Sequence, residues 1–300
     1  MNLIHKSWAD MANDIRSSLH KIPRDTDLVV GIPKSGMTPA SMIALSLHIP
    51  SADLEGFVQG HIHTHGLHRG PYRINKIEQV KKVLVVDDWT NHGSGIERAK
   101  QKLGNSTVIP RDWEIRYFSV YKHVKTNCLD IWCEEFEHDS VVFEWNMANG
   151  WFWGRSCVDI DGVLCPDPTS EQDDDGERYF DFIVNAPLKY KPRCHINTLV
   201  TNRLEKYREP TSWWLESRMV DYGRLVMYDC PDAATRRKNA ESVGWGGLIK
   251  TQTYNNSDCV LFVESNEHEA SDIHRLTGKN VLCVTNQMMY HEKPTGNSNT

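Results

Sequence analysis

One stretch decides how the second half of the chain folds: Cys157-Val-Asp159-Ile-Asp161-Gly-Val-Leu-Cys165. An apolar strand runs straight into two carboxylates, Asp159 and Asp161, and a glycine follows them. Residues i and i+2 of a strand face the same way, and we expect the strand to end at Asp159, where the chain turns. One carboxylate can then attack phosphorus while the other protonates the leaving oxygen. The alternative is that both acids only cap a strand-to-helix turn, which aspartate favours.

Short apolar strands alternate with helical stretches on both sides of this stretch. This alternation predicts parallel sheets that are covered on both faces. In the second half, strands are expected at 156–160, 197–201, 224–229, 259–264 and 280–285. In the first half, we expect helices at 3–19, 38–48 and 96–103, strands at 27–30 and 82–86, and three β-rich runs within 115–145.

The predicted fold class is α/β, with two doubly wound Rossmann-like domains. The aromatic, glycine-flanked segment Asn149-Gly-Trp-Phe-Trp-Gly-Arg155 interrupts the alternation. It places the boundary between a domain at 1–148 and a domain at 149–300. Each domain is expected to have its own core, so a fragment of residues 150–300 should fold alone. The last ten residues read as a solvated tail, and a homodimer is compatible with the sequence.

Composition narrows the class of protein. The chain has 300 residues, 39% of them hydrophobic and 25% charged, which is typical of a globular protein. The net charge of −6 gives no general affinity for nucleic acid or anionic membrane. We find no apolar run long enough to span a membrane and no signal peptide. The eight cysteines form no CxxC pair, so we expect reduced thiols and a cytoplasmic protein.

The acid pair and three later segments resemble the signatures of the haloacid dehalogenase (HAD) superfamily of phosphatases. The first signature is DxDG[TV], which residues 159–163 match. Leu199-Val-Thr201 resembles the second, Lys250 the charge-balancing lysine of the third, and Val260-Leu-Phe-Val-Glu264 the acidic fourth. The resemblance covers about residues 150–290. It implies a HAD-like fold and a magnesium-dependent phosphatase.

The resemblance also implies residue roles. Asp159 is the nucleophile and Asp161 the general acid and base, with Thr201 and Lys250 completing the catalytic set. Mg²⁺ would be held by Asp159, by Asp161 through its carbonyl, and by Glu264. Two positions depart from the pattern. Lys238 competes with Lys250 for the third signature, and the second acid of the fourth is absent, so Asn266 or Glu267 is left to replace it.

The first half contains a second strand that runs into acids, Lys82-Val-Leu-Val-Val-Asp87-Asp88-Trp-Thr-Asn-His-Gly93-Ser-Gly95. A small polar loop that opens a helix presents free backbone N–H groups to an anion. Adjacent carboxylates suit the vicinal hydroxyls of a sugar. Upstream, Val30-Gly31-Ile-Pro33-Lys34-Ser35-Gly36 also lies after a strand and before a helix.

These two segments resemble the phosphoribosyl-pyrophosphate (PRPP) signature and the pyrophosphate loop of type I phosphoribosyltransferases. The resemblance covers about residues 1–145 and implies that fold. His92 and Gly95 stand where many members have Thr or Ser. The alternative is a doubly wound domain without a PRPP site. The implied PRPP-binding residues are Lys34, Ser35, Gly36, Asp87, Asp88, Thr90, Asn91, His92, Gly93, Ser94 and Gly95.

Two further groups of residues invite a functional interpretation. The segment 60–73 contains His61, His63, His65 and His68 with two arginines. The first three would share one strand face and could bind zinc, the segment could close over PRPP and neutralise pyrophosphate, or it could be a solvated loop. For the tryptophan pairs at 151/153 and 213/214, we expect a role in packing rather than in stacking on a sugar.

A phosphoribosyltransferase fused to a phosphatase suggests two consecutive reactions. The first half would transfer 5-phosphoribose from PRPP to an acceptor, and the second would remove the 5-phosphate. The pairing resembles bacterial enzymes that install ribofuranose in surface polysaccharides, which implies a glycan hydroxyl as acceptor. Two alternatives stay open: nucleotide or nucleobase metabolism, and a PRPP-sensing domain that regulates a HAD phosphatase.

Overall fold

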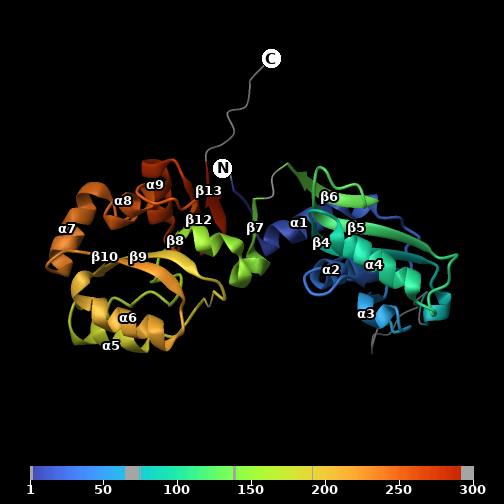
Figure 1. Cartoon of the computed structure of the whole chain (residues 1–300), viewed down its shortest axis with the longest axis horizontal. Coiled ribbons are helices and arrows are strands. Elements are labelled where there is room, and N and C mark those ends of the chain that lie inside the picture. The colour runs from blue at the N-terminus through green and yellow to red at the C-terminus, as the bar shows by residue number, and fades with distance from the viewer. Residues whose placement is uncertain (1–2, 65–73, 75, 138–139, 191, 292–300) are drawn as a thin grey trace, which may run out of the picture. The chain divides into compact units, whose positions relative to one another are not determined.

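The chain folds into two compact units (Figure 1). The structure is a computed structural model, and it describes residues 3–64, 74, 76–137, 140–190 and 192–291. The first unit is Lys6–Asp139, and the second unit combines Met1–His5 with Ser140–Thr300. The chain therefore crosses between the units twice, whereas the sequence suggested one boundary at 148/149. No helix within the described ranges has the length and apolar character needed to cross a membrane.

The first unit is built on a parallel five-stranded sheet. Helices α3 and α4 pack on the sheet face that carries Leu28, Val30, Val83 and Val85. The strands are β2 (Leu28–Gly31), β3 (Ser51–Asp53), β4 (Lys82–Thr90), β5 (Glu114–His123) and β6 (Ile131–Phe136), in the order β3-β2-β4-β5-β6. The helices are α1 (Trp8–Ser18), α2 (Met37–Leu47), α3 (Leu54–Phe57) and α4 (Ser94–Asn105), with 3₁₀ turns at Leu19–Lys21 and Ile77–Gln79.

Two elements of the first unit differ from their predicted bounds. The helix expected at 3–19 begins at Trp8, because Ser7 and Asp10 form a capping box. The strand expected at 82–86 continues to Thr90, because β4 keeps pairing with β5 as far as Thr90 and Lys122. Asp87 and Asp88 therefore lie within the strand rather than after it.

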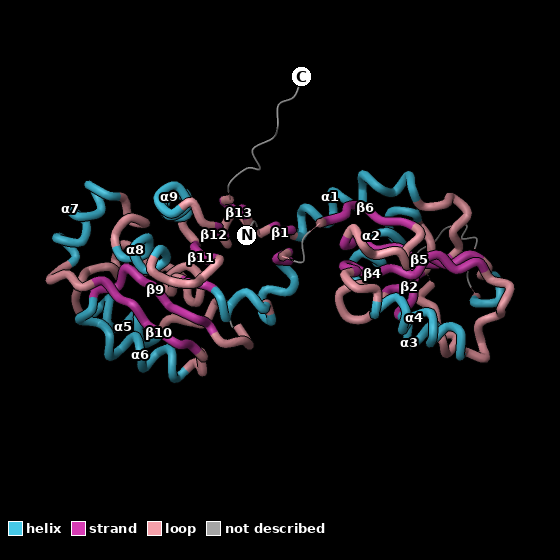
Figure 2. The backbone as a smooth tube through the Cα atoms, turned by 45° about the horizontal axis from the view of Figure 1, so that its top comes forward, coloured by secondary structure: helices cyan, strands magenta, loops and turns pink. Residues whose placement is uncertain are grey.

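The second unit is built on a six-stranded sheet in the order β10-β9-β8-β11-β12-β13 (Figure 2). All neighbours are parallel except β13, an antiparallel edge strand that the sequence did not suggest. The strands are β8 (Ser156–Val158), β9 (Ile196–Leu204), β10 (Tyr222–Tyr228), β11 (Leu261–Glu264), β12 (Asn280–Cys283) and β13 (Met288–Tyr290). The helices are α5 (Glu177–Asn185), α6 (Arg208–Ser217), α7 (Ala233–Val243), α8 (Ile249–Asn255) and α9 (Glu267–Thr277), with 3₁₀ turns at Glu144–Asn149, Trp151–Arg155 and Glu205–Tyr207.

Alternate residues of these strands face opposite layers of helices. Val158 and Val263 pack in a core with α5 and α6, whereas Cys157 and Phe262 pack in a second core with α8 and α9. Figure 1 shows these two pairs of helices on opposite sides of the sheet. The predicted α/β class with parallel sheets is thus confirmed.

The N-terminal residues belong to the core of the second unit. Leu3 is fully buried there, and its N–H donates to Asn280 Oδ1 at 3.3 Å. Strand β1 (Ile4–Lys6) forms a two-stranded sheet with β7 (Val141–Phe143). Val142 and Met147 belong to the same core. The expectation that residues 150–300 form a complete domain therefore needs correction, because that fragment lacks three core residues.

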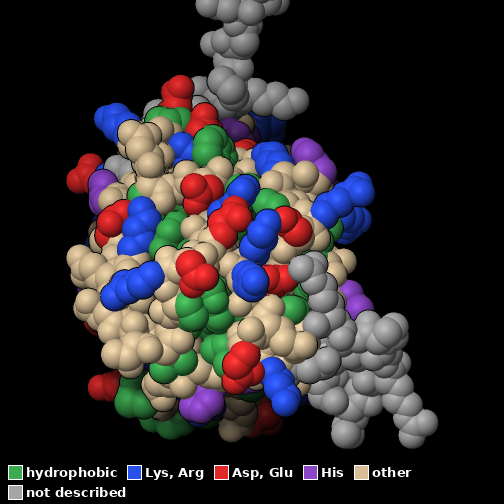
Figure 3. All heavy atoms as spheres, turned by 90° about the vertical axis from the view of Figure 1, so that its right-hand side faces the viewer, with side chains coloured by type: hydrophobic (Ala, Val, Ile, Leu, Met, Phe, Trp, Pro, Cys, Tyr) green, Lys and Arg blue, Asp and Glu red, His purple; other side chains and the backbone are tan. Residues whose placement is uncertain are grey.

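The surface carries charges of both signs. On the face drawn in Figure 3, described acidic and basic side chains are interspersed. This face therefore lacks the continuous basic field that attracts nucleic-acid phosphates. All eight cysteines are unpaired, as the sequence predicted.

Leu3→Ala should destabilise the second unit although the residue lies at the start of the chain. Removing a fully buried leucine side chain costs about 2–5 kcal/mol. Denaturant unfolding followed by tryptophan fluorescence measures the loss, because Trp153 and Trp214 are buried in this unit. Leu45→Ala, at a position 80% exposed, is the matched control and should cost less than about 0.5 kcal/mol. Equal effects of the two substitutions would contradict the assignment of Leu3 to this core.

Candidate active sites

Each sheet has a switch point, where the chain order reverses between two neighbouring strands. Ligands of open α/β sheets bind beyond the carboxyl ends of the strands at this point. In the second unit the switch point lies between β8 and β11, and in the first between β2 and β4. Asp159 directly follows β8, and Glu264 is the last residue of β11. Asp87 and Asp88 lie near the carboxyl end of β4.

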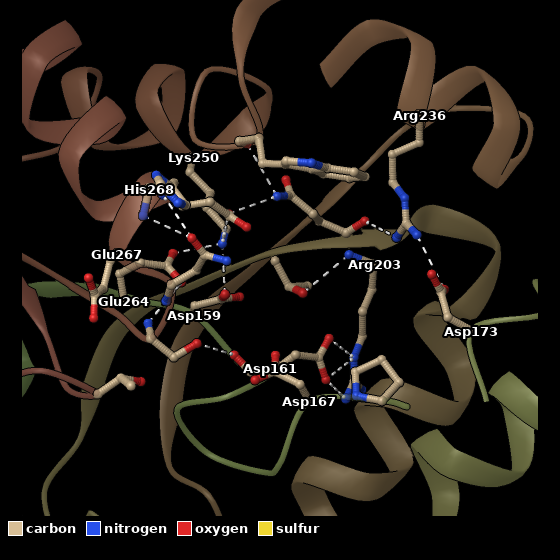
Figure 4. Close-up of a pocket in the computed structure, with 18 of the residues that line it drawn as sticks. Asp159, Asp161, Asp167, Asp173, Arg203, Arg236, Lys250, Glu264, Glu267 and His268 are labelled. Carbon is tan, nitrogen blue, oxygen red and sulfur yellow. Dashed lines mark hydrogen bonds and ion pairs between the residues drawn. The ribbon is translucent and has the colours of Figure 1, made fainter. Parts of the chain in front are cut away.

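A cavity of about 610 Å³ opens at the switch point of the second unit (Figure 4). Seven carboxylates and three Arg or Lys side chains line it. Negative charge is therefore in excess, and a phosphate ester would be repelled unless a cation entered with it.

Lys250 of α8 lies between three carboxylates of this cavity. Its Nζ is 2.7 Å from Asp159 Oδ2, 2.7 Å from Glu264 Oε2 and 2.6 Å from Glu269 Oε2. Burial raises the pKa of Asp159 well above its usual value, although the ammonium of Lys250 opposes this effect. Burial acts against the charge of Lys250, but the carboxylates outweigh it and raise the Lys250 pKa. The cluster binds one positive charge and keeps an excess of negative charge.

The residues between which the sequence left two choices open differ in their contacts. Lys250 contacts the acids, whereas Lys238 is exposed and does not line the cavity. Glu269, which the sequence analysis did not identify, is the further acid that contacts Lys250. Asn266 instead caps α9, because its Oδ1 accepts hydrogen bonds from the N–H groups of His268 and Glu269. The position of Glu269 in the first turn of α9, after this cap, was the available signal.

Asp161 is held by Arg203, a residue to which the sequence pattern assigned no role. Arg203 Nη2 donates to Asp161 Oδ1 at 2.6 Å, and its Nε donates to Oδ2 at 3.0 Å. Arg203 is fully buried, and this bidentate geometry fixes the orientation of the Asp161 carboxyl group. Thr201 faces the same cavity, and its Oγ1 accepts the N–H of Arg203 at 3.2 Å.

Two of the three donors expected for Mg²⁺, the Asp161 carbonyl and Glu264, are connected through Ser265. Ser265 Oγ donates to the carbonyl of Asp161 at 3.3 Å, and Ser265 N–H donates to Glu264 Oε1 at 2.8 Å. Oxygen donors of this kind suit magnesium. Among the described residues, no group of three or more His, Cys, Asp or Glu side chains could hold a metal ion. The expected set is compatible with this finding because it uses two carboxylates and one main-chain carbonyl.

In the first unit, two loops meet at the β2–β4 switch point. Ser35 Oγ donates to Asp88 Oδ1 at 2.7 Å and so connects the loop after β2 to the acids of β4. Gly36 allows this approach, since a Cβ there would lie 2.6 Å from Ile32 O and 2.7 Å from Val86 O. Lys34 is exposed in the same loop. Two segments that lie about fifty residues apart are thereby combined in one site.

The carboxyl group of Asp87 has a raised pKa and therefore keeps its proton to a higher pH than an ordinary aspartate. Burial and the neighbouring charge of Asp88 raise the pKa of Asp87 from 3.8 to about 8. Asp87 Oδ1 accepts the N–H of Asp88 at 3.0 Å. Gly95 leaves room for the same carboxylate, since a Cβ there would lie 3.2 Å from Asp87 Oδ2. The absence of a hydroxyl at position 95 therefore has a steric reason.

The loop after β4 presents backbone groups rather than the Thr90 hydroxyl. Thr90 is buried, and its Oγ1 donates to Ser119 Oγ at 3.0 Å. Gly93 adopts a positive φ of 79° just before α4, and a Cβ there would lie 2.8 Å from Cys128 Sγ. A cavity of about 580 Å³ borders this loop, and its lining includes Asn91, His92 and Gly93 together with His123 at the end of β5 and residues 125–128 after it. Ser94 is exposed at the first turn of α4.

The histidine segment is only partly described. His61 and His63 are exposed, and the backbone of His63 pairs with Ser51. His65 and His68 lie outside the described residues, as do both arginines of the segment.

In each of the two tryptophan pairs, 151/153 and 213/214, one side chain is buried and the other is exposed. Trp153 and Trp214 are fully buried, which confirms packing, whereas Trp151 is 45% and Trp213 53% exposed.

Comparison with known proteins gives structural matches only. No protein-family model matches the chain, and no curated protein matches its sequence. The chain is similar to the xanthine-guanine-hypoxanthine phosphoribosyltransferase of Helicobacter pylori, at 15% identity and a TM-score of 0.36 over 48% of this chain and 92% of that one. It is also similar to a purine phosphoribosyltransferase of Pyrococcus horikoshii, at 18% identity and a TM-score of 0.33 over 48% and 94%. A third match is a hypothetical protein of Neisseria gonorrhoeae with bound ppGpp, at 17% identity and a TM-score of 0.34 over 49% and 90%.

Asp87→Asn should change how the stability of the first unit depends on pH. Because the pKa of Asp87 is raised to about 8, the folded state keeps a proton that the unfolded chain releases near pH 4. Wild-type stability should therefore fall as pH rises from about 4 to 8, by up to a few kcal/mol. The asparagine variant cannot ionise and should lack this loss, so it should be the more stable protein at pH 8.

Urea unfolding at pH 5, 7 and 9 measures this difference. Asp112→Asn, at an exposed position, is the control and should keep the wild-type pH dependence. Parallel profiles for wild type and Asp87→Asn would contradict the raised pKa.

Proposed function

We propose that this chain is a bifunctional enzyme that transfers 5-phosphoribose from PRPP to an acceptor and then hydrolyses the 5-phosphate. The observation that carries the proposal is the buried cluster of Asp159, Glu264 and Glu269 around Lys250 at the β8–β11 edge. Buried ionisable groups with strongly raised pKa values that line a cavity are candidates for a functional site. The transferase half is supported by the hydrogen bond between Ser35 and Asp88 at the β2–β4 edge.

In the phosphatase, Asp159 would attack phosphorus while the bond to the leaving oxygen breaks. Asp161 would give its proton to that oxygen once Arg203 releases it. Water would then attack the aspartyl-phosphate, with Asp161 taking the proton, and free Asp159 and phosphate would result. Thr201 would hold a phosphate oxygen, and Lys250 would balance the charge of the acids.

Asp159, the Asp161 carbonyl and Glu264 would hold Mg²⁺. When bound, the ion would neutralise charge on the phosphate and on the acids that surround it.

In the transferase, the two acids of β4 would bind the 2- and 3-hydroxyls of the ribose. Negative charge on this pair would stabilise the cationic ring that forms as the C1–oxygen bond breaks, and the raised pKa of Asp87 limits the share that Asp87 carries at neutral pH. The N–H groups of 90–95 would hold the 5-phosphate, with Ser94 adding a hydroxyl. Lys34–Gly36 would hold the departing pyrophosphate. Because the hydroxyl of Thr90 is occupied by Ser119, Thr90 would contribute its backbone only.

The order of the two reactions favours a glycan acceptor. In nucleotide salvage, removing the 5-phosphate would destroy the useful product. In attaching plain ribofuranose to a glycan, the same hydrolysis is the required second step. Both activities in one chain therefore suit polysaccharide biosynthesis.

Asp159→Asn should abolish phosphate release. Loss of a nucleophile lowers the rate by at least about 10³-fold. Phosphate release from a 5-phosphoribosyl glycoside in the presence of Mg²⁺ is the measurement, and chelation of the ion should stop it in the wild type. Asp258→Asn, at an exposed position away from the cavity, should keep the wild-type rate. Near-normal turnover by Asp159→Asn would overturn the phosphatase assignment.

The double substitution Asp87→Asn with Asp88→Asn should eliminate pyrophosphate release from PRPP. Its phosphate release from a preformed phosphoribosyl product should stay within a few-fold of wild type, because separate sites behave additively. Asp159→Asn is the reciprocal control and should still release pyrophosphate. Continued phosphoribosyl transfer by the double variant, or no binding of PRPP to the wild type, would refute the transferase half.

A further inference from the structure

Beyond the acidic cluster, the cavity of the second unit has a second wall. Arg236 of α7, Trp245 and Asn202 of β9 line it, and Asp173 lies beside Arg236 (Figure 4). Asn202 directly follows Thr201 on the same strand, so this wall begins next to the proposed phosphate position. The phosphatase mechanism above does not use any of these four side chains.

Two buried polar atoms of this wall lack partners among the described residues: Arg236 Nε and Asn202 Oδ1. Arg236 is only 7% exposed, and its other nitrogens donate to Asn202 O at 2.9 Å and to Asp173 Oδ1 at 3.4 Å. Asn202 Nδ2 donates to Trp245 O at 3.2 Å and to Glu269 Oε2 at 3.3 Å. Both of these are acceptors, so the orientation of the amide is fixed and Oδ1 remains the free end.

One free donor and one free acceptor define the chemistry of the missing group. Leaving either atom buried without a partner costs about 1–3 kcal/mol. A hydroxyl group can accept from an arginine N–H and can donate to an amide oxygen, so a ligand with several hydroxyls has the chemistry to serve both atoms. An anion satisfies only the arginine and is opposed by the amide oxygen.

The charges of the wall also favour a neutral ligand. Asp173 already compensates Arg236, and carboxylates are in excess over the rest of the lining. Trp245 is 36% exposed, and the Arg236 guanidinium lies 5.5 Å from its ring centre. An aromatic ring beside hydroxyl-binding groups suits the C–H face and hydroxyls of a sugar.

We propose that Asn202, Arg236 and Trp245 form a subsite for a neutral, hydroxyl-rich leaving group, the sugar to which the phosphate is esterified. The inference rests on the proposed phosphatase function and specifies its substrate class. The enzyme would hydrolyse the phosphate monoester of a furanose better than that of a deoxygenated ring, and a second phosphate on the leaving group would not be favoured.

The test compares two phosphate monoesters: methyl ribofuranoside 5-phosphate and its 2,3-dideoxy analogue. Wild type should prefer the first in kcat/KM by at least about tenfold, because buried polar groups reject a ligand that lacks their hydroxyl partners. Arg236→Met should reduce this ratio to below about threefold. Arg237→Met is the matched control: Arg237 contacts the same Asp173 at 3.4 Å but does not line the cavity, so the ratio should be unchanged.

The ratio separates recognition from a structural role. If Arg236 only supported the fold, its substitution would lower both rates and leave the ratio at the wild-type value, which would overturn the subsite. Arg236→Lys keeps the charge and removes the Nε donor, so it should lose the preference even if Arg236→Met does not fold. Equal hydrolysis of both esters by wild type would refute the subsite while leaving the phosphatase intact. Hydrolysis of neither ester would refute the phosphatase itself.

Discussion

The second unit depends on one buried ammonium group that lies among three carboxylates. Lys250 on α8 contacts Asp159 after β8, Glu264 at the end of β11 and Glu269 on α9, so four elements converge on a single nitrogen. Removing one member of such a cluster leaves an uncompensated buried charge, which costs several kcal/mol. The three acids also outnumber the ammonium, and the same cluster lines the cavity of this unit. The contacts that hold these four elements together therefore also set the charge of the cavity.

Parallel strands give both units a site at the same kind of edge. Because the strand order reverses at β8–β11 and at β2–β4, the connections diverge there and leave a crevice. In the first unit the acids of β4 face the loop after β2 across this crevice, and Ser35 joins the two. In both units burial raises the pKa of a carboxyl group at this edge, Asp87 in the first unit and Asp159 in the second.

The chain passes from one unit to the other twice, so the second unit contains segments that precede and follow the first unit in sequence. Leu3 and Val142 lie in one core although about 140 residues separate them. The second unit can complete its core only after the first unit has been synthesised. At the edge of the second unit's sheet, Arg203 holds Asp161 through two hydrogen bonds, and the two residues come from different elements.

The local sequence pattern determined which residues lie at or near the carboxyl ends of strands. Tertiary packing determined which of these residues contact one another. The acids at 87, 88, 159 and 264 could be found from sequence because apolar runs lead directly to them, and strand ends gather at one edge of a parallel sheet. Other residues of this cavity could not be found from the sequence, because their contacts join separate elements. They are Glu269, Arg203, and Asn202 and Arg236 with their unpartnered buried atoms. Leu3 shows the same limit: its spacing fits a helix, but the capping box at Ser7 makes that helix begin only at Trp8, and Leu3 packs in a distant core instead. Periodicity reports the environment of a residue along its own element, whereas its partners are set by the whole fold.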